Sequence, residues 1–152
     1  MERAHLTRYG LLSVSGDDAR EFLHAQLTND IRELPADRSA LAGWCSAKGR
    51  LLASFLVIPA PHGFLLQVAR DLAAGVAKRL SMFVLRSKVK IADESESWVQ
   101  HGVWDADWVQ PQVSWQGRIA TVRVGERRYL QLGPAADMTE VPTAGEENWT
   151  LQ

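Results

Sequence analysis

The sequence predicts an α+β protein: a mainly antiparallel sheet with two helices packed on it, followed by a smaller β-rich unit. Two segments carry apolar residues at helical spacing. Hairpin signals lie around residues 47–49 and 125–126. After residue 92 the composition changes, because five of the six tryptophans follow there. We therefore expect an α+β domain over residues 1–92 and an incomplete β-rich, tryptophan-rich unit over residues 93–152.

The chain over residues 10–92 is expected to follow the order β-α-β-β-β-α-β. An apolar run at 11–14 predicts the first strand. The segment DDAREFLHAQL then places its apolar residues on one face of a helix, which Ser15, Asp17 or Asp18 can cap. The polar residues at 28–30 end this helix.

A hairpin is expected between SALAGWCS and RLLASFLVI, with its turn at Ala47-Lys48-Gly49. RLLASFLVI is apolar almost throughout, which is typical of a strand buried on both faces. The PAPHG break separates it from FLLQVA, a further strand. Helical spacing follows in DLAAGVAKRLSMFVL, with Arg70-Asp71 at its start, and RSKVKIA predicts a half-buried strand.

Beyond residue 93 the sequence predicts strands and no helix. IATVRV and RRYLQL flank Gly125-Glu126 as a second hairpin. The tail TEVPTAGEEN is acidic and rich in turn-forming residues, so we expect a loop or linker there. Trp149 follows it as the fourth residue from the end of the sequence, which indicates that a following element is missing.

Charge and cysteine content exclude several classes of function. The net charge is −1, although residues 1–90 hold 13 Lys and Arg against 8 Asp and Glu and residues 91–152 hold 4 against 10. General binding to a nucleic-acid backbone is therefore not expected. The single cysteine, Cys45, excludes an internal disulfide and a cysteine metal cluster. No signal segment and no membrane-length apolar run occur, so we expect a cytoplasmic protein, with a matrix-type organelle as the alternative.

No motif in the chain identifies an enzyme by itself, and the polar candidates each have two interpretations. Asn29 and Asp30 either end the first helix through side-chain to backbone bonds or bind a ligand. Lys48, Gly49 and Arg50 are either an exposed turn or a site for a carboxylate or phosphate. Cys45 is either a small buried apolar residue or a nucleophile, and its place in a strand favours the first.

Four phrases occur in an order that resembles a known family: GDDAREFLHAQLTNDIREL, WCSAKGRLLASFLV, HGFLLQVARD and MFVLRSKVKI. Together they resemble the N-terminal part of the YgfZ-type folate-binding proteins. These are GcvT-like proteins, related to the aminomethyltransferase of the glycine cleavage system. The resemblance covers about residues 6–92 well and the rest loosely.

The resemblance implies a domain that binds tetrahydrofolate or a related folate, with a role in iron–sulfur cluster assembly or repair and in linked tRNA modification. Tyr9 matches an aromatic position that can pack on the cofactor. Asn29 and Asp30 match the family's Thr-Asn-Asp phrase, and Lys48, Gly49 and Arg50 match its hairpin tip. A flat pterin suits ring stacking, and a cation suits the glutamate tail. The partners implied are the folate and iron–sulfur client proteins, without direct nucleic-acid binding or a membrane.

Two departures from the family pattern bear on activity. Ala53 and Ser54 stand where the aminomethyltransferases carry an aspartate pair, so aminomethyl transfer is not expected. The Lys-Gly-Cys-x-x-Gly-Gln-Glu motif of the YgfZ branch is absent, and Cys45 does not match its cysteine. We therefore expect a truncated member of the family.

Three functions follow from these observations, in order of support. The first is a non-catalytic, folate-binding YgfZ-like protein. The second is a protein-interaction module or a fragment without a ligand, in which an exposed tryptophan-rich edge meets a partner, the missing C-terminal domain or another copy. The third is a glycine-cleavage-type aminomethyltransferase, against which Ala53 and Ser54 argue.

Overall fold

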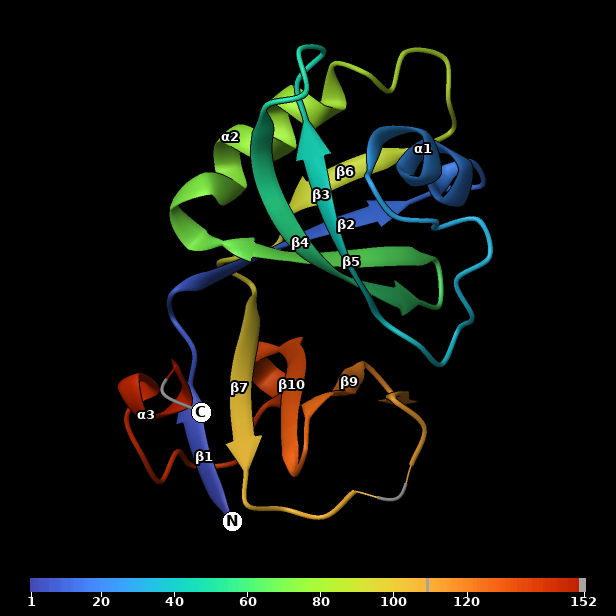
Figure 1. Cartoon of the computed structure of the whole chain (residues 1–152). Coiled ribbons are helices and arrows are strands. Elements are labelled where there is room, and N and C mark those ends of the chain that lie inside the picture. Colours follow the sequence, from blue (N-terminus) through green and yellow to red (C-terminus); the bar gives the residue numbers. More distant parts are fainter. Residues whose placement is uncertain (109, 151–152) are drawn as a thin grey trace. The chain divides into compact units, whose positions relative to one another are not determined.

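The computed structural model describes residues 1–108 and 110–150 and divides into two compact units (Figure 1). The central unit is Tyr9–Ser95. The terminal unit combines Met1–Arg8 with the described residues from Glu96 onward. The division expected at residue 92 therefore differs at the N-terminus, where the first eight residues belong with the later part of the chain. Residues 151–152 of the expected second unit lie outside the described residues.

The central unit is an antiparallel five-stranded sheet with two helices, in the strand order β3-β4-β5-β2-β6. Its elements are β2 (Tyr9–Ser15), α1 (Ala19–Gln26), β3 (Ala40–Cys45), β4 (Leu51–Ala60), β5 (Gly63–Ala69), α2 (Arg70–Ser81) and β6 (Lys90–Asp93). This is the expected order β-α-β-β-β-α-β. The α+β class predicted from the sequence is confirmed.

One hydrophobic core joins both helices to one face of this sheet. Strand residues alternate between the two faces of the sheet. Leu12 and Leu66 therefore enter the core, while Ser13 and Gln67, the next residue along each strand, face the other way. From α1 the core takes Phe22 and Leu23; α2 contributes residues at helical spacing: Ala73, Val76, Ala77 and Leu80. The opposite face carries buried residues too, among them Leu11, Ile58 and Leu65, beside the more exposed Leu41 and Ser54.

The second helix is shorter than its sequence pattern predicted. It ends at Ser81, whose hydroxyl donates to the carbonyl of Ala77 at 2.7 Å, and Phe83 lies beyond it in an exposed turn. Lys78 and Arg79 lie in the last turn, where their positive charges interact favourably with the negative end of the helix dipole. The following strand starts only at Lys90, so RSKVKIA is a strand in its last three residues alone.

The terminal unit is a second antiparallel sheet, in the order β1-β7-β10-β9-β8. Its elements are β1 (Glu2–His5), β7 (Trp98–Trp104), β8 (Val113–Gln116), β9 (Ile119–Gly125), β10 (Arg128–Pro134), a 3-10 turn (Ala135–Asp137) and α3 (Glu146–Thr150). The Gly125-Glu126 hairpin is confirmed. β1, β7 and β8 were not expected, because β1 and β8 have only four residues each and the β7 sequence, WVQHGVW, does not alternate regularly.

The expectation of no helix after residue 92 is wrong. α3 forms in the acidic tail because Glu146 accepts hydrogen bonds from the Thr7 and Arg8 backbone amides, each at 2.9 Å, and Trp149 is buried. Trp149 packs against Trp104, with ring centroids 6.1 Å apart. None of the five tryptophans of this unit is exposed, so the expected exposed tryptophan edge is wrong.

Two expectations about burial are also corrected. β4 is not buried on both faces along its length, because Leu51 and Ser54 are exposed in its first half. Cys45 is half-buried rather than buried, at the end of β3 where the register with β4 shifts.

No described helix is long and apolar enough to span a bilayer.

Candidate functional site

A row of side chains lies on the sheet face of the central unit opposite the helices, and the strand register brings these side chains together. Leu41 of β3 pairs with Leu56 of β4, and Leu56 pairs with Gln67 of β5. Directly paired residues point to the same face of a sheet. Two positions along, Gly43 pairs with Ser54 on that same face. Tyr9 pairs with Ala69 and so lies diagonally from Gln67.

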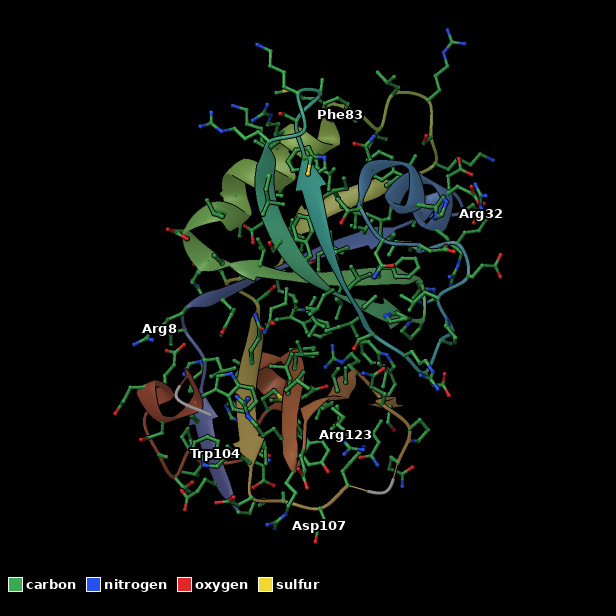
Figure 2. The ribbon with its side chains drawn as sticks, viewed as in Figure 1. Arg8, Arg32, Phe83, Trp104, Asp107 and Arg123 are labelled. Carbon is green, nitrogen blue, oxygen red and sulfur yellow. The ribbon has the colours of Figure 1, made fainter. Side chains whose placement is uncertain are left out.

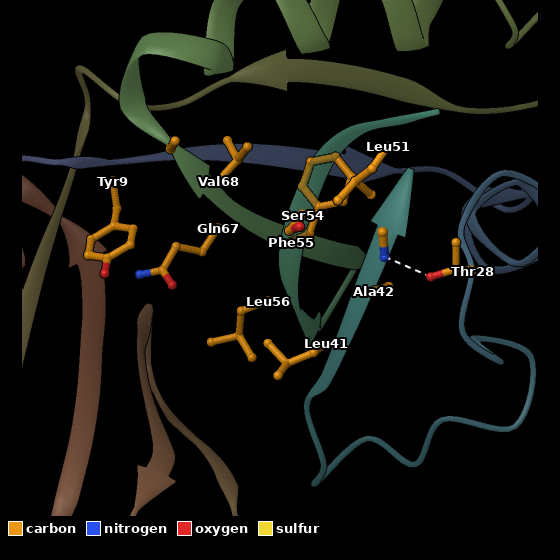
Figure 3. A pocket seen from close by; sticks show the side chains of 12 residues that line it. Tyr9, Thr28, Leu41, Ala42, Leu51, Ser54, Phe55, Leu56, Gln67 and Val68 are labelled. Carbon is orange, nitrogen blue, oxygen red and sulfur yellow. Dashed lines mark hydrogen bonds between the residues drawn. The ribbon is translucent and has the colours of Figure 1, made fainter. Parts of the chain in front are cut away.

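These residues line a pocket of about 500 Å³, which lies within the usual range of roughly 300–1,000 Å³ for small-molecule sites (Figure 3). Its walls are largely apolar, from Leu41, Leu51 and Leu56. Its polar groups are the side chains of Tyr9, Thr28, Ser54 and Gln67. No charged residue lines it. A pocket of this kind suits a flat, largely neutral ring system with a few hydrogen-bonding groups.

Tyr9 is the predicted site residue that lines this pocket. It begins β2, is half-buried and lines one end of the pocket. Figure 3 shows the Tyr9 ring and the Gln67 amide at the same end of the pocket. An aromatic ring beside an amide can stack on a heterocycle and hydrogen-bond its edge.

Gly43 keeps the floor of the pocket open. A β-carbon at this position would come within 2.8 Å of the Leu51 Cδ1 atom and 3.4 Å of the Thr28 hydroxyl. The Thr28 hydroxyl accepts a hydrogen bond from the Gly43 amide at 2.8 Å, and the Thr28 amide donates to the Gly43 carbonyl at 2.9 Å. The chain leaving α1 is thereby fixed along the outer edge of β3.

Asn29 extends this edge contact. Its side-chain amide donates to the Leu41 carbonyl at 2.9 Å, and its side-chain oxygen accepts from the Asp30 amide at 2.7 Å. The Asp30 carboxylate lies 3.2 Å from the His24 ring and accepts from the Glu33 amide at 3.2 Å. Both residues therefore hold backbone after helix α1, and neither lines the pocket. Their ligand role stays a prediction.

Lys48, Gly49 and Arg50 form the exposed turn between β3 and β4 and also do not line the pocket. Gly49 has a φ of +80°, a conformation that glycine adopts at little cost, and its amide donates to the Ser46 carbonyl at 2.9 Å. The geometry of this turn is therefore sufficient to account for a glycine at position 49. Binding of a ligand by the two cations stays a prediction.

Ala53 and Ser54, the positions at which the family resemblance implies an aspartate pair in the aminomethyltransferases, face opposite ways. Ser54 is exposed and lines the pocket, whereas Ala53 is 4% exposed and belongs to the helix-side core. Of the pair, only residue 54 can present a group to a ligand. The described pocket thus offers a hydroxyl where a carboxylate would be needed to manage an amine's charge and proton.

Gln67, Thr28 and Gly43 were not among the candidate residues drawn from the sequence. The hairpin turn at 47–49 could have found Gly43, since it brings Gly43 opposite Ser54 on one face. Gln67 and Thr28 lie outside this hairpin, and no local signal points to them. Among the described residues, no group of three or more His, Cys, Asp or Glu is placed to hold a metal.

Comparisons with known proteins give relatives by sequence. The chain is 33% identical over 115 residues to a mitochondrial iron-sulfur cluster assembly factor IBA57 homolog of Neurospora crassa, which is 70% of this chain and 26% of that protein. It is 30% identical over 92 residues to the tRNA-modifying protein YgfZ of Serratia proteamaculans, which is 60% of this chain and 28% of that protein. No family model matches the chain.

A solved structure shares the fold. The glycine cleavage system aminomethyltransferase T of Bartonella henselae superposes with a TM-score of 0.76 over 90% of this chain and 42% of that one, at 15% sequence identity. The chain spans about a quarter of the length of the curated relatives it matches.

Proposed function

The chain has a YgfZ-type, GcvT-like fold, and from this premise we propose that its central unit binds a tetrahydrofolate-type ligand and takes part in iron–sulfur cluster assembly. The observation that carries the proposal is the uncharged pocket with Tyr9 at one end and Gly43 at its floor. The linked tRNA modification and a cytoplasmic location remain part of the proposal.

The pocket fits the ring end of such a ligand. Tyr9 brings an aromatic ring suited to stacking, and the Gln67 amide brings a polar group suited to hydrogen bonding at the same end. Leu41, Leu51 and Leu56 supply apolar walls, and two of these leucines, Leu41 and Leu51, are 75% and 59% exposed. Covering them with a ligand would remove apolar surface from water, which favours binding.

The charged tail of a folate has no partner within the described pocket. No lining residue is a cation, so a glutamate tail would extend out of the pocket toward solvent. Lys48 and Arg50 are the cations that the family resemblance assigns to it. Screening makes an exposed cation of this kind worth little, so most of the affinity should come from the ring end.

The proposed role is non-catalytic. A bound tetrahydrofolate carries one-carbon units, but the pocket-lining residues include no Asp or Glu to hold or move a proton on an amine. The Ser54 hydroxyl can donate and accept hydrogen bonds to a ligand, but it carries no negative charge to balance an amine. The aminomethyltransferase function is therefore not supported by these residues.

The role in iron–sulfur cluster assembly rests on the names of the sequence relatives. IBA57 homologs of Neurospora crassa and Cryptococcus neoformans are iron-sulfur cluster assembly factors, and YgfZ of Serratia proteamaculans is a tRNA-modifying protein. Each matches over a limited part of its own length, so partners among iron–sulfur client proteins are a proposal for this chain.

Calorimetric titration of the full chain with tetrahydrofolate tests the ligand. We expect saturable binding that weakens by about tenfold in Tyr9→Ala, since one stacked ring is worth roughly 1–1.5 kcal/mol. Gln67→Ala should also weaken the binding of tetrahydrofolate. Lys88→Ala serves as a control for Lys48→Ala, because both lysines are exposed and neither lines the pocket.

Absence of heat at millimolar tetrahydrofolate would contradict folate binding. An unchanged affinity in Tyr9→Ala would place the ligand elsewhere. The assembly role is tested separately, by deleting the gene in its host and assaying iron–sulfur enzymes; unchanged activities would contradict it even if the folate binds.

A further inference from the structure

One end of the central unit combines cations with exposed apolar side chains. Residues 38–92 hold nine Lys and Arg, at positions 38, 48, 50, 70, 78, 79, 86, 88 and 90, against a single acid, Asp71. Several of these cations lie at the β3–β4 turn, in the last turn of α2 and in the segment after it. Positive charge is therefore concentrated where these elements end.

Ring contacts place these segments next to one another. Trp44 of β3 meets Phe83 of the segment after α2 edge to face, with centroids 6.2 Å apart. The Arg79 guanidinium carbon lies 5.9 Å from the centroid of the Trp44 ring. Figure 2 shows Phe83 at the end of the unit where β3 ends and the β3–β4 turn begins.

The segment after α2 exposes three large apolar side chains. Met82 is 63% exposed, Phe83 49% and Leu85 88%. The helix-side core contains none of them. We call the exposed Met82, Phe83 and Leu85 with Lys48, Arg50, Lys78, Arg79 and Arg86 the cationic–apolar surface.

Leu85 is unusual in its backbone as well. Its φ of +51° lies in the left-handed region, which costs free energy for a residue with a β-carbon and is uncommon for a bulky one. Glycine or asparagine would adopt this φ more cheaply. Because Leu85 is 88% exposed, burial in this unit does not offset the strain. The leucine side chain therefore adds no burial energy to the folding of the central unit.

We propose that the cationic–apolar surface docks an acidic protein segment that carries apolar side chains. Apolar residues at the centre and charges at the rim are the usual arrangement of a protein–protein interface. The excess of cations complements an acidic partner and would speed its association. The inference does not depend on the pocket, which these residues do not line.

Other polyanionic partners fit this surface less well. Single-stranded nucleic acid is bound by aromatic side chains interleaved with cations, and here two of the three exposed apolar side chains are aliphatic. An anionic membrane would engage an amphipathic helix lying in its plane, whereas Met82, Phe83 and Leu85 lie in a non-helical segment after Ser81. Both remain outcomes of the test.

The test uses the full chain and a labelled synthetic 20-residue helix with glutamates on one face and leucines on the other. Fluorescence anisotropy should show saturable binding that weakens as salt is raised. The Leu85→Gly variant should bind about tenfold more weakly, while its thermal unfolding midpoint stays the same or rises because the strained φ is relieved. Lys48→Glu with Arg86→Glu should also weaken binding by about tenfold or more.

Three controls make the result decisive. Val141→Gly removes another largely exposed apolar side chain, 77% exposed against 88% for Leu85, in the terminal unit, and should bind as the unmodified chain does. A peptide with serine in place of leucine should bind far more weakly. Transfer RNA and phosphatidylserine vesicles should bind more weakly than the acidic helix.

The proposal is overturned by any of four results. These are no binding of the acidic helix, equal binding by Leu85→Gly, a large loss of stability in Leu85→Gly, and preferential binding of tRNA or vesicles. Concentration-dependent self-association abolished by the same variants would assign the surface to a second copy of this chain instead.

Discussion

Ala53 and Ser54 are neighbours in sequence and differ in what they can do. The alternation of a strand sends Ala53 into the helix-side core and Ser54 into the pocket. The family resemblance implies that both residues stand where related aminomethyltransferases carry carboxylates. Only the residue that faces the pocket bears on chemistry, and the other bears on packing.

This difference predicts opposite effects of a restored carboxylate. Ala53→Asp should lower the free energy of unfolding of the central unit by more than 3 kcal/mol, because it buries an unpaired charge. Ser54→Asp should change it by less than about 0.5 kcal/mol, since that side chain is exposed. Urea unfolding followed by circular dichroism measures both. Equal losses would contradict the assignment of the two faces.

His101 is a second residue whose neighbours decide its chemistry. Arg3 donates to its Nδ1 atom at 3.0 Å and to the Gln131 side-chain oxygen at 2.8 Å, and the His5 ring packs against it edge to face. Burial, and then the charges of Arg3 and His5, lower the pKa of His101 from 6.5 to about 4. The ring is therefore neutral at pH 7.

The free energy of unfolding of the terminal unit should consequently depend on pH. The unfolded chain binds a proton at His101 below pH 6.5 and the folded chain only below about 4, so the free energy of unfolding falls as the pH drops through this window. The loss attributable to this group is on the order of 3 kcal/mol. His101→Gln keeps an acceptor for Arg3 and should flatten the decrease between pH 7 and 4. An equal slope in both proteins would contradict the assignment.

At the scale of elements, α3 depends on one glycine in β7. A β-carbon at Gly102 would overlap the Trp149 ring, which packs on Trp104 and lies under the Arg128 guanidinium at 4.4 Å from its centroid. Helix α3 has five residues, too short to be stable alone, so this packing and Glu146 hold it.

Two glycine-to-alanine changes should have opposite signs. Gly102→Ala should displace Trp149 and cost about 1–3 kcal/mol of unfolding free energy. Gly75→Ala, inside α2 with nothing within 4 Å of the new β-carbon, should add up to about 1 kcal/mol. Urea unfolding and tryptophan fluorescence report both. Gly102→Ala combined with Trp149→Ala should cost less than the sum of the two, and strict additivity would contradict the contact.

The chain after α1 is the second element whose role can be tested. Because the Asn29 amide is committed to the Leu41 carbonyl, Asn29→Ala should cost about 1 kcal/mol of unfolding free energy. We expect the tetrahydrofolate affinity to change by less than about threefold. A tenfold loss of affinity with unchanged stability would instead make Asn29 a ligand-binding residue.

At the scale of the whole molecule, the N-terminal strand belongs to the same unit as the residues from Glu96 onward. β1 buries Ala4, and Leu6 just after it is also buried, while β1 pairs with β7 from Glu2↔Trp104 to His5↔His101. The core of the central unit uses none of these residues. The two units are therefore interleaved along the sequence.

Deleting residues 1–8 should separate the two units experimentally. Hydrogen exchange of β7 and β10 should accelerate, because β7 loses its edge partner and α3 loses the Thr7 and Arg8 amides. The strands β2, β4 and β5 should keep their protection. Loss of protection in both units alike would contradict the division.

The sequence by itself determined the α+β class, the order of elements in the central unit and both hairpins. Helical and strand periodicities and turn residues are local signals, and each of these features is built from contacts close in the chain. Tyr9 came from a family resemblance, which needs no coordinates. The tertiary structure alone decided the rest. Pairing of β1 with β7 joins residues about a hundred positions apart, and the pocket assembles Tyr9, Gly43, Ser54 and Gln67 from four strands through their register. No local pattern encodes a long-range pairing or the face that it creates, because both follow from which strands meet and not from the residues within any one of them.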